Sequence, residues 1–170
     1  MIDVNKLMQM AEDTTTHKKI VMDNCLLLAK HFANNGEVDF AIELLKRGAN
    51  HDNSKFNCTE FKSLSRILKS KDCFTDASVS LSNEEKQAIA YHWKHNRHHP
   101  EYFDDISEMT RLDIAEMVCD WFARSLQYKT DFIPFIEERQ KNRFHFSPEK
   151  FEEIHSFCVT LESLYKESLK

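Results

Sequence analysis

Helical periodicity runs through most of the chain. Apolar residues recur at intervals of three and four in successive segments, and this spacing places them on one face of an α-helix. Two glycines and three prolines in 170 residues are too few for a turn-rich β architecture. We expect helices over 4–12, 16–34, 37–47, 59–71, 82–98, 106–128, 131–142 and 148–168, with a loop over 72–81. The pattern therefore predicts an all-α bundle of six to eight helices in a single domain, 1–170.

Residues typical of helix ends support several of these boundaries. Three threonines, Thr14 to Thr16, offer an N-cap for the second predicted helix. Gly36 and Gly48 each follow a helical segment, where helices commonly end on glycine. The run Ser82-Asn83-Glu84-Glu85 has the spacing of a capping box, and Ser147-Pro148 is typical of a helix start.

The segment 106–128 differs from the others because it is apolar around most of its circumference. Its polar residues fall on one narrow stripe, formed by Asp113, Glu116, Asp120 and Arg124. A helix that is apolar nearly all round belongs in the centre of a fold. We therefore expect the longest and most central helix here, with its polar stripe facing either solvent or a wet cavity that binds a ligand.

Two histidines and two aspartates form a candidate metal site. His17 shares a helical face with apolar neighbours and so points toward the core, while the adjacent His51 and Asp52 follow the third predicted helix. Imidazole nitrogen with carboxylate oxygen is a ligand set for divalent transition metals. Burying these groups is costly unless a cation compensates. We predict that three helices bring His17, His51, Asp52 and an aspartate of the central helix, Asp113 or Asp120, to one ion.

The order of these residues in a helical chain resembles the HD-domain superfamily of metal-dependent phosphohydrolases. Three segments are similar to a small bacterial and phage branch of that superfamily: His51-Asp52-Asn53-Ser54-Lys55-Phe56, the histidine-rich stretch Tyr91 to Phe103, and Glu116-Met117-Val118-Cys119-Asp120-Trp121. The resemblance spans His17 to Trp121 and places the distal ligand at Asp120, which leaves Asp113 beside the site or in solvent. That branch has no settled reaction, so the resemblance implies an HD-like helical fold more directly than an activity.

Four histidines cluster near the end of the predicted 82–98 helix. They are His92, His95, His98 and His99. HD proteins that hold two metals place two further histidines between the His-Asp pair and the last aspartate, with the aspartate of the pair bridging. The resemblance thus implies His92 with His98 or His99 as ligands of a second ion or as phosphate contacts. A solvated, histidine-rich helix end is the alternative, since adjacent histidines cannot both face one site from a regular helix.

Lys55 separates this chain from relatives that hydrolyse deoxynucleoside monophosphates, which carry a glutamate at the corresponding point. A lysine cannot act as a carboxylate base, but it can hold a phosphate as a point charge. We therefore expect Asp52, His92 and Lys55 to carry the chemistry. Lys94, which should point to water, and two arginines, Arg97 and Arg124, could add phosphate contacts.

Three classes of function follow from the resemblance. The favoured class is a metal-dependent phosphohydrolase that acts on a small phosphate ester, with a nucleotide as the favoured substrate. It would use one or two divalent ions of Mn, Fe, Co, Ni or Zn. An HD-type oxidase with a di-iron pair that activates oxygen is the second. A non-catalytic helical module that binds a metal or a nucleotide is the third. The substrate, the native metal and the oligomeric state stay open.

The net charge limits the kinds of partner that we expect, and the cysteine content indicates the cellular compartment. A net charge of −5 argues against a nucleic-acid polymer as the main partner, because such proteins usually present a basic face. Five cysteines without a Cys-x-x-Cys pair are typical of reduced thiols in a cytosolic protein and predict small core residues. The chain begins without the features of a signal peptide and has no apolar run long enough for a bilayer. We expect a cytoplasmic protein without a membrane partner.

Overall fold

The computed structural model describes residues 3–67 and 81–170. Over these residues the regular structure is all helical, with seven α-helices and no strand. The helices are α1 (Val4–Asn34), α2 (Val38–Asn50), α3 (Cys58–Ile67), α4 (Asn83–His95), α5 (Arg111–Tyr128), α6 (Phe132–Arg139) and α7 (Pro148–Ser168). Three 3₁₀ turns, η1 (Asn53–Phe56), η2 (Pro100–Tyr102) and η3 (Ile106–Glu108), and one π turn, η4 (Gln140–Phe144), complete the regular structure of the described residues. The predicted all-α fold is confirmed.

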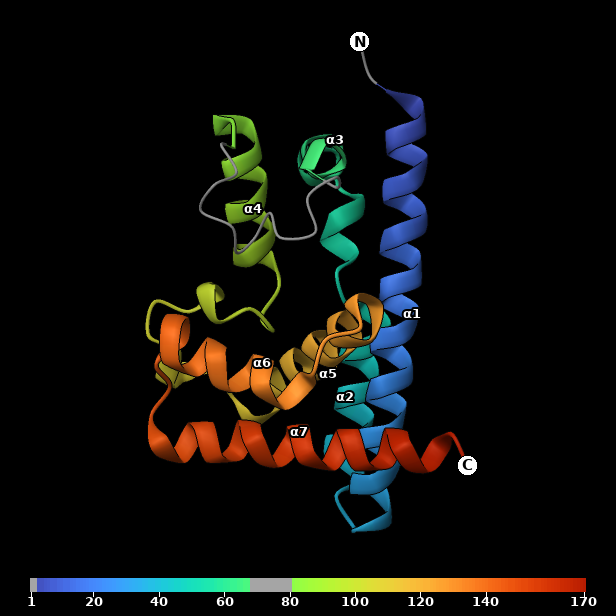
Figure 1. Ribbon diagram of the computed structural model, residues 1–170, viewed down its shortest axis with the longest axis vertical. Helices are drawn as coiled ribbons and strands as arrows, with labels where there is room; N and C mark the ends of the chain where they lie inside the picture. Colours follow the sequence, from blue (N-terminus) through green and yellow to red (C-terminus); the bar gives the residue numbers. More distant parts are fainter. Residues whose placement is uncertain (1–2, 68–80) are drawn as a thin grey trace.

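The helices are arranged around the long first helix. Figure 1 shows α1 running along one side of the molecule, with α2 beside its lower half and α3 beside its upper half. Helix α7 lies across the lower end of α1, and α5 packs on both α1 and α7. Helix α4 stands next to α3 in the upper part of the view. Within the described residues, no helix has both the length and the apolar character that a membrane span requires.

Helix α1 is continuous, so the prediction of two helices with a cap at Thr14 to Thr16 is wrong. The helix begins at the side chain of Asp3, which accepts hydrogen bonds from the backbone N–H groups of Asn5 and Lys6. Met10 and Thr14 are buried and extend the inward face that contains His17. Packing along this face outweighs the low helix propensity of threonine and its preference for N-cap positions.

Helix α2 does not end at Gly48 as predicted but continues to Asn50. A Cβ atom on Gly48 would lie 2.9 Å from the Cβ of Cys25 and 3.0 Å from the Sδ of Met22, both on α1. Glycine is therefore needed here for the close approach of two helices, not for a helix end. Gly36, in contrast, has φ of +89° and fills the predicted role in the turn after α1.

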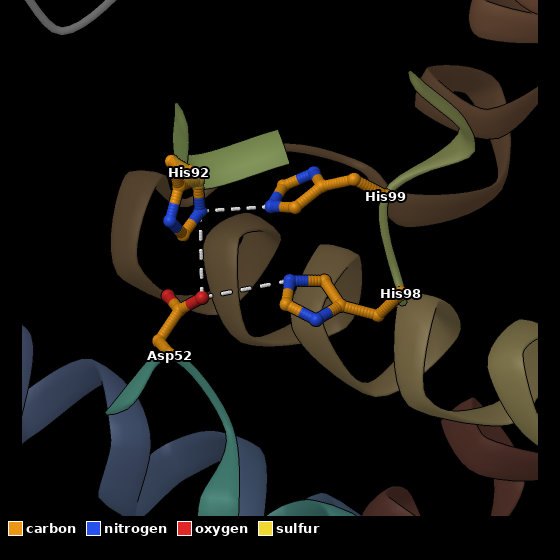
Figure 2. Close-up of side chains that lie close together, drawn as sticks. All are labelled: Asp52, His92, His98 and His99. Carbon is orange, nitrogen blue, oxygen red and sulfur yellow. Dashed lines mark hydrogen bonds and ion pairs between the residues drawn. The ribbon is translucent and has the colours of Figure 1, made fainter. Parts of the chain in front are cut away.

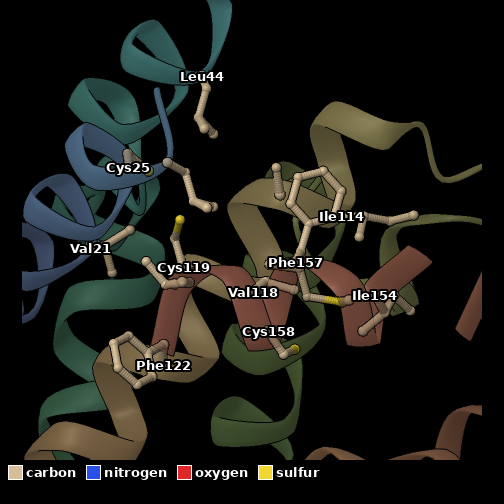
Figure 3. Packing of buried hydrophobic residues seen from close by; sticks show 14 of the residues in the cluster. Val21, Cys25, Leu44, Ile114, Val118, Cys119, Phe122, Ile154, Phe157 and Cys158 are labelled. Carbon is tan, nitrogen blue, oxygen red and sulfur yellow. The ribbon is translucent and has the colours of Figure 1, made fainter. Parts of the chain in front are cut away.

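The central helix α5 is shorter than predicted, because its N-terminal part forms the separate turn η3. Thr110 caps α5 through a capping box with Asp113, which fixes the helix start at Arg111. Helix α5 has 18 residues and α1 has 31, so the prediction that α5 would be the longest is wrong. Its central position holds: much of its surface is buried in the main apolar cluster (Figure 3).

Other helix ends differ from the sequence pattern in smaller ways. Helix α4 has the predicted capping box at Ser82 but ends at His95, three residues before the predicted end. Helix α6 ends at Arg139 and passes into the π turn η4. Helix α7 spans the predicted residues and has the predicted cap at Ser147. The predicted helical residues 68–71 and most of the predicted loop 72–81 lie outside the described residues.

The core has a large and a small part. The large cluster joins α1, α2, α5 and α7, and Cys25, Cys119 and Cys158 are buried in it as predicted (Figure 3). The small cluster packs α1 against α3 and α4, through Met10, Leu64, Ala88 and Ile89. Helix α1 contributes to both clusters, and His17 lies on it between the two contributions.

Candidate metal centre

The four ligands predicted for one ion lie together; we call His17, His51, Asp52 and Asp120 the first ligand group. The Nε2 of His17 lies 2.8 Å from Oδ1 of Asp120 and 3.9 Å from Oδ2 of Asp52. The Nε2 of His51 lies 3.5 Å from Oδ2 of Asp52 and 3.8 Å from Oδ1 of Asp120. Asp120, not Asp113, brings its carboxylate to this group, as the family resemblance implied.

A left-handed backbone conformation at Asp52 lets the adjacent side chains of His51 and Asp52 both point into the site. Asp52, between α2 and η1, has φ of 54°, a conformation that is uncommon for residues other than glycine. Lys18 of α1 holds the turn, since its Nζ donates to the backbone oxygen of His51 at 2.5 Å and to the side-chain oxygen of Asn53. The turn directs the imidazole of His51 and the carboxylate of Asp52 into one centre.

A second ligand group, Asp52, His92, His98 and His99, shares the carboxylate of Asp52. Figure 2 shows the imidazoles of His92 and His98 directed toward that carboxylate and the imidazole of His99 directed toward His92. The Nε2 atoms of His92 and His98 lie 3.4 Å and 3.6 Å from Oδ1 of Asp52. The Nε2 of His99 lies 2.9 Å from that of His92. Since Oδ2 of Asp52 faces the first ligand group and Oδ1 faces the second, this carboxylate lies between two sets of candidate ligands.

The early end of α4 explains how both His98 and His99 reach the centre. The side chain of Asn96 donates to the backbone oxygen of His92 at 2.7 Å, and the chain then turns instead of continuing as a helix. The two adjacent rings lie 4.2 Å apart between centroids. The expectation that only one of them could face the site depended on a regular helix to residue 98 and is wrong. His95 is exposed and stacks on Tyr91, so it lies outside the centre.

The hydrogen bonding of the buried ligand atoms shows whether these residues fit a metal. Five buried side-chain atoms of the two ligand groups make no hydrogen bond of regular geometry, although the first and last of them lie 2.8 Å apart: Nε2 of His17, His51 and His98, and Oδ1 of Asp52 and Asp120. Leaving such atoms unsatisfied is costly, and most buried polar atoms in native proteins have a partner. Nitrogen and oxygen donors of this kind are the ligands of divalent transition metals. The residues therefore fit one or two such ions, and the identity of the metal stays a prediction.

The opposite ring nitrogens are already occupied. The Nδ1 of His17 lies 2.9 Å from Oε1 of Gln127, and the Nδ1 of His92 lies 3.0 Å from Oε2 of Glu60. A single oxygen, Oε1 of Glu116, lies 3.1 Å from Nδ1 of His51 and 3.3 Å from Nδ1 of His98. Since these oxygens only accept, Nδ1 of His17, His51 and His98 carries the proton and Nε2 of each is left for a metal. For His92, Nδ1 also lies 3.1 Å from the side-chain nitrogen of Asn96, and Nε2 contacts that of His99.

Sequence reasoning missed the three residues that orient the imidazoles. Glu116 was placed on the polar stripe of α5, one turn before Asp120, but without a role. Glu60 and Gln127 are each one of several polar residues in their helices and carry no periodic signal; only their positions in the fold relate them to His92 and His17. Asp113 is fully buried, and it pairs with two arginines rather than with a histidine.

Burial keeps most of the imidazoles neutral in the metal-free protein. Burial, aided by the nearby Arg124 guanidinium, lowers the pKa of His17 from 6.5 to about 4. Burial also lowers the pKa of His92, and burial together with the neighbouring imidazoles of His98 and His92 lowers the pKa of His99 well below 6.5. A neutral imidazole is the form that binds a metal.

The carboxylates are ionised despite their burial. Burial raises the pKa of Asp52 and Asp120, but neighbouring imidazoles, with Lys55 beside Asp52, outweigh it and hold both values well below 3.8. Burial likewise raises the pKa of Glu116, but its hydrogen bonds from His51 and His98 bring the value to about 2. Burial would lower the pKa of His98, but the hydrogen bond to Glu116 raises it overall, so a metal here competes with a proton.

Two of the predicted phosphate contacts lie at the centre and two lie elsewhere. The buried Lys55 has its Nζ 2.5 Å from Oδ2 of Asp52. The Nε of Arg124 lies 4.0 Å from Oδ1 of Asp120, and its side chain is 34% exposed. Arg97 is paired with Asp113 instead. Lys94 points outward as predicted, where it bonds Asp104 and the backbone oxygen of Tyr102.

Comparison with known proteins adds a family but no activity. No curated protein and no solved structure matches the chain. A model of the family of unknown function DUF5662 matches residues 6–160, a range that includes both ligand groups and the residues that orient them. The chain belongs to this family.

Proposed function

We propose that the chain is a metal-dependent phosphohydrolase that acts on a small phosphate ester, with nucleotides as the favoured substrates. The observation that carries the proposal is the set of five buried ligand atoms without a regular hydrogen bond, gathered around one shared carboxylate. The HD-like order of His17, His51-Asp52 and Asp120 supports the reaction class. Membership of the DUF5662 family is compatible with this and other activities.

Each ligand group would hold one divalent ion. The first ligand group supplies two imidazoles and two carboxylates, and the second supplies three imidazoles and the other oxygen of Asp52. A bound divalent ion polarises phosphoryl oxygens and lowers the pKa of water toward about 7. The ionised Asp52 and Asp120 offset half of the charge of two divalent ions, and imidazoles that bind in the neutral form complete the ligand sets without adding positive charge.

The remaining polar residues would bind and orient the phosphate. Lys55 lies against Asp52 and cannot accept a proton from water as a glutamate would, so its role is to hold negative charge. Asp120 and His99 are the least buried of the seven ligands, and Arg124 lies beside Asp120. We therefore place the approach of the substrate on the side of these three residues, where Arg124 offers a second positive charge. His92 acts as a ligand, because Glu60 holds its other nitrogen.

Metal content and phosphate release test the proposal together. Protein purified without a histidine tag should contain one or two equivalents of a transition metal by elemental analysis, and should release phosphate from members of a panel of nucleotides and sugar phosphates. Asp52→Ala should lose both the metal and the activity, because Asp52 belongs to both ligand groups. Asp104→Ala is the matched control, since Asp104 is exposed and bonds only Lys94 among the contacts described, and it should retain both. Full metal content in Asp52→Ala would refute the assignment.

A di-iron centre that activates oxygen is the second candidate. The three imidazoles of the second ligand group favour it, because imidazole suits iron and a carboxylate shared between two metals suits an iron pair. Mixed-valence iron seen by electron paramagnetic resonance, with oxygen consumption and without phosphate release, would favour this reading. A metal bound without either activity would favour the non-catalytic module.

A further inference from the structure

Glu116 contacts one imidazole from each ligand group. Its Oε1 lies 3.1 Å from Nδ1 of His51, in the first group, and 3.3 Å from Nδ1 of His98, in the second. The two rings lie 4.3 Å apart between centroids. The contact with His51 has the length of an N–H···O hydrogen bond, and the contact with His98 is slightly longer. Glu116 therefore acts on both rings from the Nδ1 side, while both Nε2 atoms face the centre.

The surroundings of Glu116 leave Oε1 to the two histidines. Its other oxygen, Oε2, accepts from Nη1 of Arg47 at 3.1 Å, and Nη2 of the same guanidinium donates to Asp113 at 2.7 Å. Arg47 thereby fixes the carboxylate from the side away from the rings. Glu116 is 3% exposed, so water does not compete effectively for Oε1.

We infer that Glu116 is a positioning residue that serves both metal positions at once, by fixing the ring orientation and the tautomer of a histidine in each. The inference rests on the proposed binding of metal by the two ligand groups. Gln127 and Glu60 provide the contrast, because the first contacts only His17 and the second only His92 among the ligands. Loss of Glu116 should therefore weaken both positions, whereas loss of either of the others should weaken one.

Cobalt binding separates the two positions. His92→Ala removes a ligand of the second group and leaves the first, and His17→Ala does the reverse. In each of these backgrounds the affinity for Co²⁺ is measured by titration calorimetry, and the ligand field is read from the visible absorption of the bound ion. Adding Glu116→Ala should lower the affinity about 10- to 100-fold in both backgrounds, the usual effect of removing a group that orients a metal ligand.

Two further variants distinguish positioning from general stability. Glu116→Gln keeps an oxygen that can accept from Nδ1, so it should recover part of the affinity at both positions. Asp113→Asn weakens the pairs of Asp113 with Arg47 and Arg97, one turn away, and leaves the contacts of Glu116 with Arg47 and with the two histidines in place. It should lower the melting temperature but leave the Co²⁺ affinities and spectra unchanged. If Glu116→Ala does not fold, the Co²⁺ affinities of Glu116→Gln and Asp113→Asn are compared instead.

The outcomes separate this inference from the proposed function. Unchanged affinity at either position in the Glu116 variants would overturn the inference while metal binding stands. The same loss in Asp113→Asn as in Glu116→Ala would also overturn it, because the effect would then be one of packing. A wild-type protein that binds no Co²⁺ would remove the proposed function and the inference together.

Discussion

Gly48→Ala tests how the packing of α1 and α2 controls the metal centre. In an exposed helix this change stabilises by about 1 kcal/mol, because alanine favours the helix. Here the new Cβ would lie 2.9 Å from the Cβ of Cys25, and neither atom is the end of a flexible side chain. Carbon atoms pack at about 3.5–4.0 Å, so the two helices must separate by roughly half an ångström or more.

The expected net effect is a loss of stability. Overpacking of this kind costs about 1–3 kcal/mol, and contact with a Cβ that cannot rotate away places this site near the upper end. Subtracting the helix preference leaves a loss of about 2 kcal/mol, equivalent to a fall of roughly 4–8 °C in the melting temperature of a chain of this size. The backbone N–H of His51 donates to the oxygen of Gly48, so the shift should also move His51 and weaken metal binding at the first ligand group.

Gly36→Ala is the matched control for this change. Its φ of +89° makes alanine strained, but a Cβ there meets nothing within 4 Å. It should lose about 1–2 kcal/mol from backbone strain and keep its metal affinity. Thermal denaturation and Co²⁺ titration of both variants measure the two effects. A Gly48→Ala protein as stable as the wild type, or one with unaltered Co²⁺ affinity, would refute the reasoning from helix packing.

Three further predictions concern the ligands and their charge. His92→Ala should lose the metal of the second ligand group and the phosphatase activity. His95→Ala, three residues further along the same helix but exposed, should keep both, as measured by elemental analysis and phosphate release; equal behaviour of the two would contradict the assignment. Lys55→Met should retain metal but bind inorganic phosphate at least tenfold more weakly by calorimetry, and unchanged phosphate affinity would exclude the role given to this lysine. The metal-free protein should lose stability as the pH falls from about 6.5 to about 4. The pKa of His17 is 6.5 in the unfolded chain and about 4 in the folded protein, so over this range the unfolded state binds more protons than the folded state. Thermal denaturation in EDTA measures this, and a melting temperature that stays constant or rises across that range would show that His17 is not buried as a neutral ring.

The sequence predicts the first ligand group because each member carries a local signal. His17 lies on an apolar helical face, and His51 and Asp52 are adjacent, so one correct helix boundary places both. The choice of Asp120 over Asp113 came from the family resemblance, since both residues share one face of α5. In the structure the two aspartates differ by their partners, because arginines from α2 and from the turn after α4 hold Asp113.

The residues that orient the imidazoles could not be predicted in the same way. Glu60 interrupts no pattern and becomes significant only because α3 packs beside α4, which brings it to His92. Gln127 is 110 residues from His17 along the chain. Hydrogen-bond partners at such separations follow from the packing of whole helices, and a periodic pattern in one helix does not encode which helix it will meet.

Both places where adjacent residues face the centre are interruptions of a helix. At Asp52 the chain takes a left-handed conformation as α2 ends, and at Asn96 a side chain takes over a backbone oxygen as α4 ends. A regular helix turns about 100° per residue and separates neighbouring side chains, so neither His51 with Asp52 nor His98 with His99 could share a target from within one. The irregular ends therefore allow seven ligands to gather from few elements, and α5 supplies between them a carboxylate, Glu116, that contacts one histidine from each of these two pairs.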